Sequence, residues 1–205
     1  MKKQVLFISG GDSFSKYEDF LQDLRTRTIR SLPSKESTKF WTETLEEDLG
    51  DDYELFRPAM PNKQNAKYEE WKIWFERHFE YLHDDVVLIG WSLGGMFLTK
   101  YLSEKTFPLK IKALYLLGAP CGSCADEGGN DCGSFQYLPE TLHKIYEQVK
   151  DISIMHSKDD FVVPYEHAFL YKKHLNKASL HTYEDKNHFL VPEFKELIYD
   201  IKNRK

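Results

Sequence analysis

Six short segments with strand character constrain the fold of this chain more than any other feature. Four of them are continuous apolar runs bounded by polar or turn residues, and two are weaker. A strand that is apolar on both faces is typical of a parallel sheet covered by helices on both sides. The strong runs are Val5–Ile8, Val86–Ile89, Ala113–Leu117 and Ile152–Met155, and the weaker candidates are Tyr53–Phe56 and Ser179–Tyr183.

Helical patterns alternate with these segments. In the first pattern Tyr17, Phe20 and Leu24 fall on one face, and Ser15 with Glu18 has the spacing of a capping box. The alternation indicates an α/β fold, and right-handed crossovers restrict it to doubly wound forms, in which ligands bind beyond the carboxyl ends of the strands. The other helical patterns cover Lys39–Leu49, Tyr68–Leu82, Met96–Leu102, Pro139–Val149, Tyr165–His174 and Glu193–Ile201.

Length and charge narrow the class of protein further. A chain of 205 residues fits one domain, residues 1–205, with an irregular cysteine-containing stretch at about 120–135. The formal charge of −5, from 28 basic and 33 acidic side chains, argues against nucleic acid and anionic membranes as partners. No window approaches the roughly 20 apolar residues of a membrane span. The first apolar run ends in Gly-Gly without a cleavage site, so we expect a buried strand and a cytoplasmic protein.

A nucleophile motif follows the second strong run. The pentapeptide Gly90-Trp91-Ser92-Leu93-Gly94 has the pattern G-x-S-x-G and lies between a predicted strand and a predicted helix. In that context a sharp turn exposes the serine hydroxyl above the sheet, and the helix that follows directs its free amides toward a developing oxyanion. The alternative is a chance glycine-rich turn, which the flanking strand and helix disfavour. We therefore expect Ser92 to be a nucleophile.

A serine nucleophile needs a base, and the base needs an orienting acid; in this arrangement the chain order is Ser, acid, His. Asp159 and Asp160 both follow the run Ile152–Met155, and one of them is expected to serve only as a turn former. Among the eight histidines, His188 follows the last strand and comes after the acid. His156 ends a strand but precedes the acid, and the remaining histidines lie in helical or strand patterns.

Together these motifs resemble the α/β-hydrolase superfamily. More narrowly, Ser92 with its glycines, the stretch His156–Pro164 and Asn187-His188-Phe189 resemble the small branch that includes the retinoblastoma-binding serine hydrolase of animals and its bacterial relatives. The resemblance covers essentially the whole chain. It implies a six-stranded parallel sheet in the order 2-1-3-4-5-6, with helices on both faces as a three-layer sandwich. The Leu-x-Cys-x-Glu motif of retinoblastoma binders is absent, so that partner is not carried over.

The resemblance also implies the roles of the site residues. Ser92 matches the nucleophile, His188 the base and Asp160 the acid, since the spacing of Asp160 to Val163-Pro164 fits the family pattern. The oxyanion hole is expected from the backbone amide of Leu93 and one from the loop after the first strand. By position Gly11 supplies that second amide, and Asp12 is the alternative. Candidate pocket residues are Asp12, Trp91, Phe135, Tyr137, Phe161 and Phe189.

Three cysteines, Cys121, Cys124 and Cys132, leave several interpretations open. The first is a mobile loop with free thiols. The second is a redox or disulfide pair, Cys121 with Cys124. The third is a metal site with Asp126 or Asp131 as fourth ligand, although structural zinc usually takes four Cys or His ligands. We expect no metal and no cofactor.

The function expected from these patterns is hydrolysis of small to medium carboxylic esters by a carboxylesterase-like serine hydrolase. Its partner is a small-molecule ester or acyl substrate, and the protein is expected to be a monomer or weak homodimer. A peptidase, thioesterase or acyltransferase could use the same three residues. Two further classes of protein also fit the chain: an interaction protein that keeps the fold without turnover, and a protein regulated through its cysteines.

Overall fold

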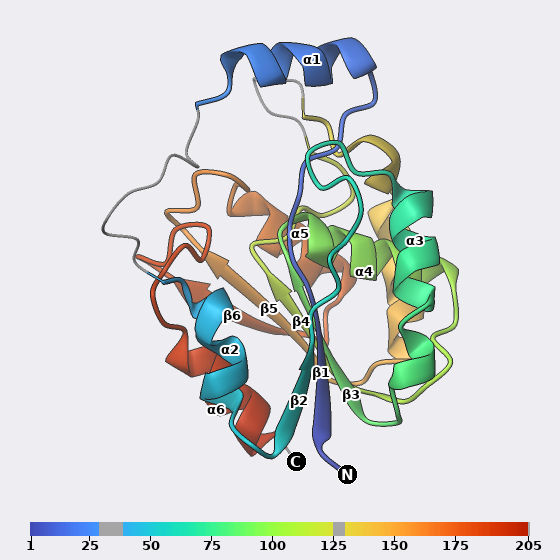
Figure 1. The fold of residues 1–205 in the computed structure, drawn as a ribbon, viewed down its shortest axis with the longest axis vertical. Helices are drawn as coiled ribbons and strands as arrows, with labels where there is room; N and C mark the ends of the chain where they lie inside the picture. The colour runs from blue at the N-terminus through green and yellow to red at the C-terminus, as the bar shows by residue number, and fades with distance from the viewer. Residues whose placement is uncertain (29–38, 125–129, 205) are drawn as a thin grey trace.

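A six-stranded, wholly parallel sheet forms the centre of the molecule (Figure 1). The structure is a computed structural model, and it describes residues 1–28, 39–124 and 130–204. The strand order is β2-β1-β3-β4-β5-β6, which confirms the predicted order. The strands are β1 (Lys3–Ile8), β2 (Tyr53–Phe56), β3 (Val86–Trp91), β4 (Ile111–Leu117), β5 (Ile152–Ser157) and β6 (Ser179–Tyr183).

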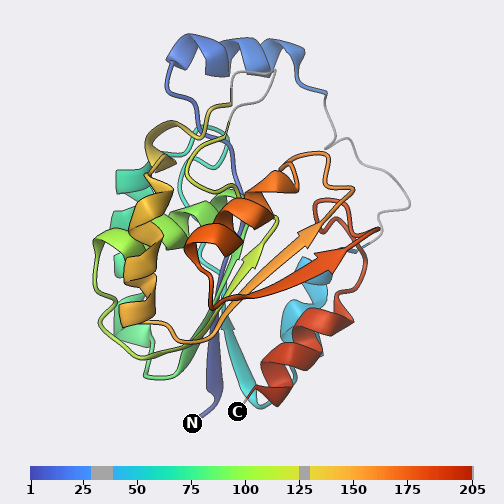
Figure 2. The same ribbon diagram turned by 180° about the vertical axis from the view of Figure 1, so that it is seen from behind.

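Helices cover both faces of the sheet, as Figures 1 and 2 show from opposite sides. Side chains alternate along each strand, so that Leu6 and Ile8 join the hydrophobic cluster under α3 and α4. Val5 and Phe7 join the cluster under α2 and α6 on the other face. The three-layer sandwich is therefore confirmed. The α-helices are α1 (Tyr17–Thr26), α2 (Trp41–Leu49), α3 (Tyr68–Glu76), α4 (Leu93–Glu104), α5 (Glu166–His174) and α6 (Lys195–Asn203).

In the described parts of the chain, three segments are 3-10 helices: η1 (Phe79–Tyr81), η2 (Gly133–Phe135) and η3 (Pro139–Glu147). The expected helix over Pro139–Val149 thus takes the tighter form. Its buried side chains Leu142 and Ile145 are three residues apart, the spacing that a 3-10 helix places on one face. Among the described helices, none is long and apolar enough to cross a membrane.

Helix α1 lies apart from both layers, beyond the carboxyl ends of the strands (Figure 1). None of its residues is buried, and Tyr17 and Leu24 are 61% and 52% exposed. The expected capping box of Ser15 and Glu18 is wrong: the helix begins at Tyr17 without a side-chain cap. The physical reason is that the Ser15 amide donates to Asp131 Oδ1 at 2.9 Å, which commits this turn to a contact with a distant loop.

Candidate active site

Ser92 occupies the sharp turn between β3 and α4. Its φ of 55° and ψ of −128° lie in a region that non-glycine residues rarely adopt, and such strain is concentrated at functional sites. The Ser92 amide donates to the Leu117 carbonyl at 2.9 Å, which ties the turn to β4. A Cβ on Gly94 would lie 2.1 Å from the Ile8 carbonyl oxygen, and one on Gly90 would lie 2.5 Å from the Cα of Gly95. Both glycines of the motif are therefore required by close backbone approach.

His188 and Asp160 form a buried pair at the carboxyl edge of the sheet. The His188 Nδ1 lies 2.8 Å from Asp160 Oδ2 and 3.1 Å from Oδ1, and both residues are buried. The amides of Val162 and Val163 each donate to Asp160 Oδ1 at 2.9 Å. These two hydrogen bonds hold the Asp160 carboxylate in position in addition to its contact with the His188 imidazole.

Asp159 has a different set of contacts from its neighbour. Its Oδ1 accepts a hydrogen bond from the Asn187 amide at 2.9 Å and another from the Ser157 hydroxyl. The Ser157 hydroxyl oxygen in turn accepts from the Lys186 amide at 2.9 Å. Asp159 therefore joins the loop after β5 to the loop that carries His188, whereas Asp160 contacts the imidazole itself.

His156 lies against the same carboxylate oxygen of Asp160 that contacts His188. It is 1% exposed, its Nε2 donates to the Val163 carbonyl at 2.9 Å, and the same nitrogen lies 3.5 Å from Asp160 Oδ2. Burial lowers the pKa of His156, although the Val163 carbonyl and Asp160 oppose that shift. His156 thus packs against the loop after β5 that carries Asp160, and it lines neither of the two cavities at Ser92.

Ser92 lies between two cavities. The larger, about 290 Å³, is lined by Ser92, His188 and Trp91 together with the loop after β1. The smaller, about 90 Å³, is lined by Ser92, Leu93 and His167 and by the cysteine loop, which we define as residues 120–124 and 130–135. A substrate bound at Ser92 can therefore extend in two directions, and His188 faces only the larger cavity.

The amides expected to form an oxyanion hole lie next to Ser92. Leu93 is the first residue of α4, where backbone amides have no partner within the helix. The Asp12 amide donates to the Lys63 carbonyl at 2.7 Å and is therefore engaged. Within the described parts of the chain, the Gly11 amide has no such acceptor, and Gly11 lines both cavities. The geometry thus favours Gly11 over the alternative, Asp12.

The candidate pocket residues divide into two groups. Trp91 and Asp12 line the larger cavity, and the Trp91 indole donates to the His188 carbonyl at 3.0 Å. Phe135 and Phe189 are instead fully buried, Phe135 against Trp71 and Phe189 against Phe194, because large aromatic rings gain most by leaving water altogether.

The two other aromatic candidates also lie outside both cavities. Phe161 is 62% exposed and lines neither of them. The Tyr137 hydroxyl forms hydrogen bonds with Thr99 at 3.0 Å and Tyr171 at 3.1 Å, inside the core. Both residues are close in sequence to loops of the site, but neither side chain lines a cavity at Ser92.

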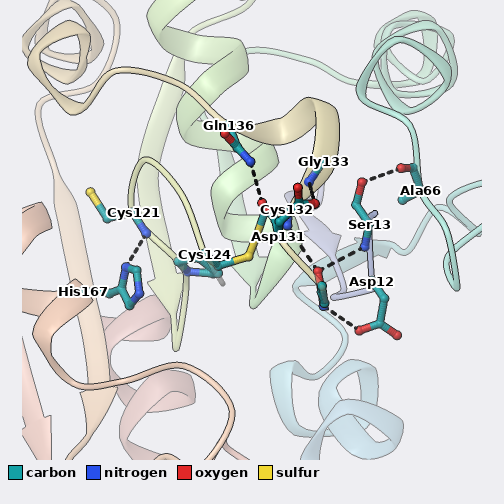
Figure 3. Close-up of a disulfide and its surroundings, with 12 residues drawn as sticks. Asp12, Ser13, Ala66, Cys121, Cys124, Asp131, Cys132, Gly133, Gln136 and His167 are labelled. Carbon is teal, nitrogen blue, oxygen red and sulfur yellow. Dashed lines mark hydrogen bonds between the residues drawn. A yellow bond between two sulfur atoms is a disulfide. The ribbon is translucent and has the colours of Figure 1, made fainter. Parts of the chain in front are cut away.

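The cysteines form a pair that the sequence patterns did not predict. Cys124 is joined to Cys132 by a disulfide, with their Cα atoms 5.5 Å apart (Figure 3). Cys121 is a buried free thiol, and burial raises its pKa to about 12, although the Tyr137 hydroxyl opposes the shift. Of the interpretations that the sequence left open, the pairing of Cys121 with Cys124 and a loop with only free thiols are both contradicted.

The described parts of the chain contain no set of ligands that would support a metal site. There, no group of three or more His, Cys, Asp or Glu side chains could hold a metal ion, and Asp126 lies outside those residues. Asp131 instead accepts hydrogen bonds from the amides of Ser15 and Gly133, at 2.9 and 3.0 Å. Burial alone would raise the pKa of Asp131, but these hydrogen bonds outweigh burial and lower it. The carboxylate thus secures a contact between loops.

The cysteine loop holds the loop after β1 in place. The side-chain Nδ2 of Asn130 donates to Asp12 Oδ1 at 3.1 Å, and the side-chain Oδ1 of Asn130 accepts from the Ser13 backbone amide at 3.5 Å. The Ser13 hydroxyl donates to the Ala66 carbonyl at 2.7 Å. Two segments distant in the sequence therefore support the loop that contains Gly11.

Gly118, His167 and Lys63 are among the site residues that sequence reasoning did not find. Gly118, at the end of β4, has a φ of 48°, and a Cβ there would lie 3.0 Å from Asp160 Oδ2. His167 Nδ1 accepts a hydrogen bond from the Cys121 amide at 3.0 Å, which leaves its proton on Nε2, and burial lowers its pKa. Lys63 lines the larger cavity. No local motif marks any of them; a glycine directly after a strong apolar run was the one available signal, and only for Gly118.

The fold and this arrangement at the carboxyl edge of the sheet define a protein of the α/β-hydrolase class. The chain belongs to the serine hydrolase family, whose family model matches residues 34–194.

Individual relatives agree with that assignment. The protein YdeN of Bacillus subtilis (strain 168) is 26% identical over 174 residues, covering 80% of this chain and 87% of the relative. The crystal structure of the B. subtilis ydeN gene product has a TM-score of 0.76 at 20% identity, covering 99% of this chain and 98% of that one. A lipase-esterase related protein from Clostridium acetobutylicum has a TM-score of 0.64 at 13% identity, covering 99% and 94%. These solved structures show the same fold.

Proposed function

We propose that this chain hydrolyses small to medium carboxylic esters through Ser92, His188 and Asp160, with an acyl-enzyme intermediate. The observation that carries the proposal is the buried His188–Asp160 pair, joined at 2.8 Å, facing a cavity that also contains the strained Ser92. One structural neighbour is an esterase domain of a Rhodothermus marinus protein, which is compatible with ester chemistry. Kinship with the branch of the retinoblastoma-binding hydrolase remains part of the proposal.

The proposed mechanism begins at the serine hydroxyl. His188 accepts the proton from Ser92 as its oxygen attacks the ester carbonyl, and Asp160 keeps the imidazole in the tautomer with the proton on Nδ1. The amides of Leu93 and Gly11 donate to the oxyanion that forms. One such donor typically contributes about 3 kcal/mol to lowering the barrier.

Release of the alcohol and attack by water complete the cycle. The protonated His188 gives its proton to the leaving oxygen, so the alcohol part of the ester occupies the larger cavity, which His188 faces. The acyl part then lies toward the smaller cavity, whose volume of about 90 Å³ favours a short acyl group. Water next attacks the acyl-enzyme, with His188 as base for the second time.

Thioester or peptide substrates would use the same residues, and one structural neighbour is a thioesterase domain from the curacin biosynthetic pathway. The short acyl cavity favours a small ester over a peptide, because an extended peptide needs a continuous groove on both sides of the scissile bond. A panel of acetate, butyrate and octanoate esters with matched thioesters and peptide amides separates these reactions.

The first test is covalent labelling. Treatment with a fluorophosphonate probe should add one label to the wild-type protein, measured by intact mass, and none to Ser92→Ala. Ser123→Ala, which changes an exposed serine of the cysteine loop, should still be labelled. Absence of a label from folded wild-type protein, with folding checked by circular dichroism, would contradict the proposal.

A further inference from the structure

The larger cavity contains one basic side chain that the proposed mechanism does not use. Lys63 lines it together with Ser92 and His188, and no other lysine or arginine does so among the described residues. Lys63 lies in the segment after β2, more than 25 residues before the nucleophile, so only the tertiary structure brings the two together. Its position next to the nucleophile raises the question of what this charge binds.

The Lys63 ammonium has few partners of its own. It donates to the Ser9 hydroxyl at 2.8 Å, and in the described part of the chain no carboxylate forms an ion pair with it. Its side chain is partly buried, and burial lowers its pKa, although Asp12 opposes the shift. An ammonium has three donors, and Ser9 uses one of them.

Asp12 is an acidic residue that also lines the larger cavity, and its carboxylate binds other groups. Its Oδ2 forms an ion pair with Arg27 at 2.8 Å, and its Oδ1 accepts from the Asn130 amide at 3.1 Å. Arg27 thus compensates the negative charge of Asp12. A partly desolvated cation without a carboxylate partner is unfavourable, and an anionic group on a ligand would remove that cost.

We propose that Lys63 forms an anion subsite in the larger cavity, and that the preferred ester carries a carboxylate on its alcohol part. This inference rests on the proposed function for its orientation, because the alcohol part is assigned to the cavity that His188 faces. The Lys63 ammonium donates to the substrate carboxylate, which positions the ester carbonyl at Ser92. A charge-assisted hydrogen bond of this kind is stronger than one between neutral groups.

The subsite is tested with two esters that differ only in charge, 3-acetoxybenzoate and 3-acetoxybenzamide. The wild-type protein should prefer the carboxylate in kcat/KM, and Lys63→Met should reduce that preference about tenfold, the effect of one charge-assisted hydrogen bond. Lys63→Arg should retain most of it, because the charge remains.

The matched control is Lys67→Met. Lys67 lies in the same segment and likewise ties it to the loop after β1, through the Phe14 carbonyl at 2.9 Å, but it lines neither cavity. It should keep the preference of the wild type. If Lys63→Met leaves the preference unchanged, or if Lys67→Met reduces it equally, Lys63 only holds the loops together and the inference is wrong.

A binding measurement separates this inference from the proposed function. Saturation-transfer NMR with 3-hydroxybenzoate and 3-hydroxybenzamide requires no turnover. Preferential binding of the carboxylate to wild type and not to Lys63→Met, in protein that the fluorophosphonate does not label, would support the subsite and contradict the hydrolase mechanism. Labelled, active protein that binds both compounds equally would support the mechanism and overturn the subsite.

Discussion

At the scale of single residues, neighbours in the sequence have different surroundings in the structure. Asp159 and Asp160 could not be separated from local sequence, and it was the family resemblance that favoured Asp160. In the structure Asp160 contacts the His188 imidazole, and Asp159 accepts from the Asn187 amide. Consecutive loop residues point in different directions, so the contact each one makes depends on the segment that packs against the loop.

The two aspartates therefore predict different mutant behaviour. Asp160→Asn should lower kcat about 10³- to 10⁴-fold, because a neutral amide no longer holds the imidazole in the required tautomer. Asp159→Asn keeps an oxygen acceptor for the Asn187 amide, so we expect less than about a tenfold loss of kcat and a modest loss of stability, about 1 kcal/mol. Steady-state kinetics on both variants, with circular dichroism as the folding control, decides between them. A larger loss for Asp159→Asn in folded protein would move the acid role to Asp159.

At the scale of elements, contacts between connecting loops position the residues that line the proposed site. The cysteine loop contacts the loop after β1 through Asn130 and Asp131, and both loops line the smaller cavity. The disulfide Cys124–Cys132 closes this loop on itself with a sequence separation of 8. The Gly11 amide thus depends on a segment more than a hundred residues away.

Reduction of that disulfide should lower the free energy of unfolding by roughly 2–3 kcal/mol, the chain-entropy value for a loop of this length. Urea denaturation with and without a thiol reductant measures the effect. Cys124→Ser/Cys132→Ser should already lack this contribution and be insensitive to reductant, whereas Cys121→Ala should remain sensitive. Insensitivity of Cys121→Ala would mean that Cys121 is one of the bonded partners.

At the scale of the whole molecule, two hydrophobic clusters on opposite faces of one sheet stabilise the fold. The same packing buries titratable groups, among them His156 and His167. Burial lowers the pKa of each histidine below its ordinary value of 6.5. Global stability is therefore coupled to pH through groups at the edge of the site.

The sign of that coupling follows from which state binds the proton. Below about pH 6.5 the unfolded chain takes up protons on both histidines, while the folded protein, in which the pKa of each histidine is lower, takes them up only at lower pH. Stability should therefore be complete above this pH and fall as the pH decreases below it, by at most about 1.4 kcal/mol per pH unit for each histidine. Urea denaturation at several pH values measures the slope, which should be shallower in His156→Gln. A slope as steep in His156→Gln as in the wild type would exclude His156 as a source of it.

The sequence alone determined the elements that local patterns encode. Continuous apolar runs predicted the strands, and the G-x-S-x-G motif between a strand and a helix predicted the turn at Ser92, because both depend on residues adjacent in the chain. Only the tertiary structure decided which cysteines pair, that Phe135 and Phe189 are buried in the core, and that Lys63 lies in the cavity of Ser92. Those outcomes depend on contacts between distant segments, whose energies no local pattern contains.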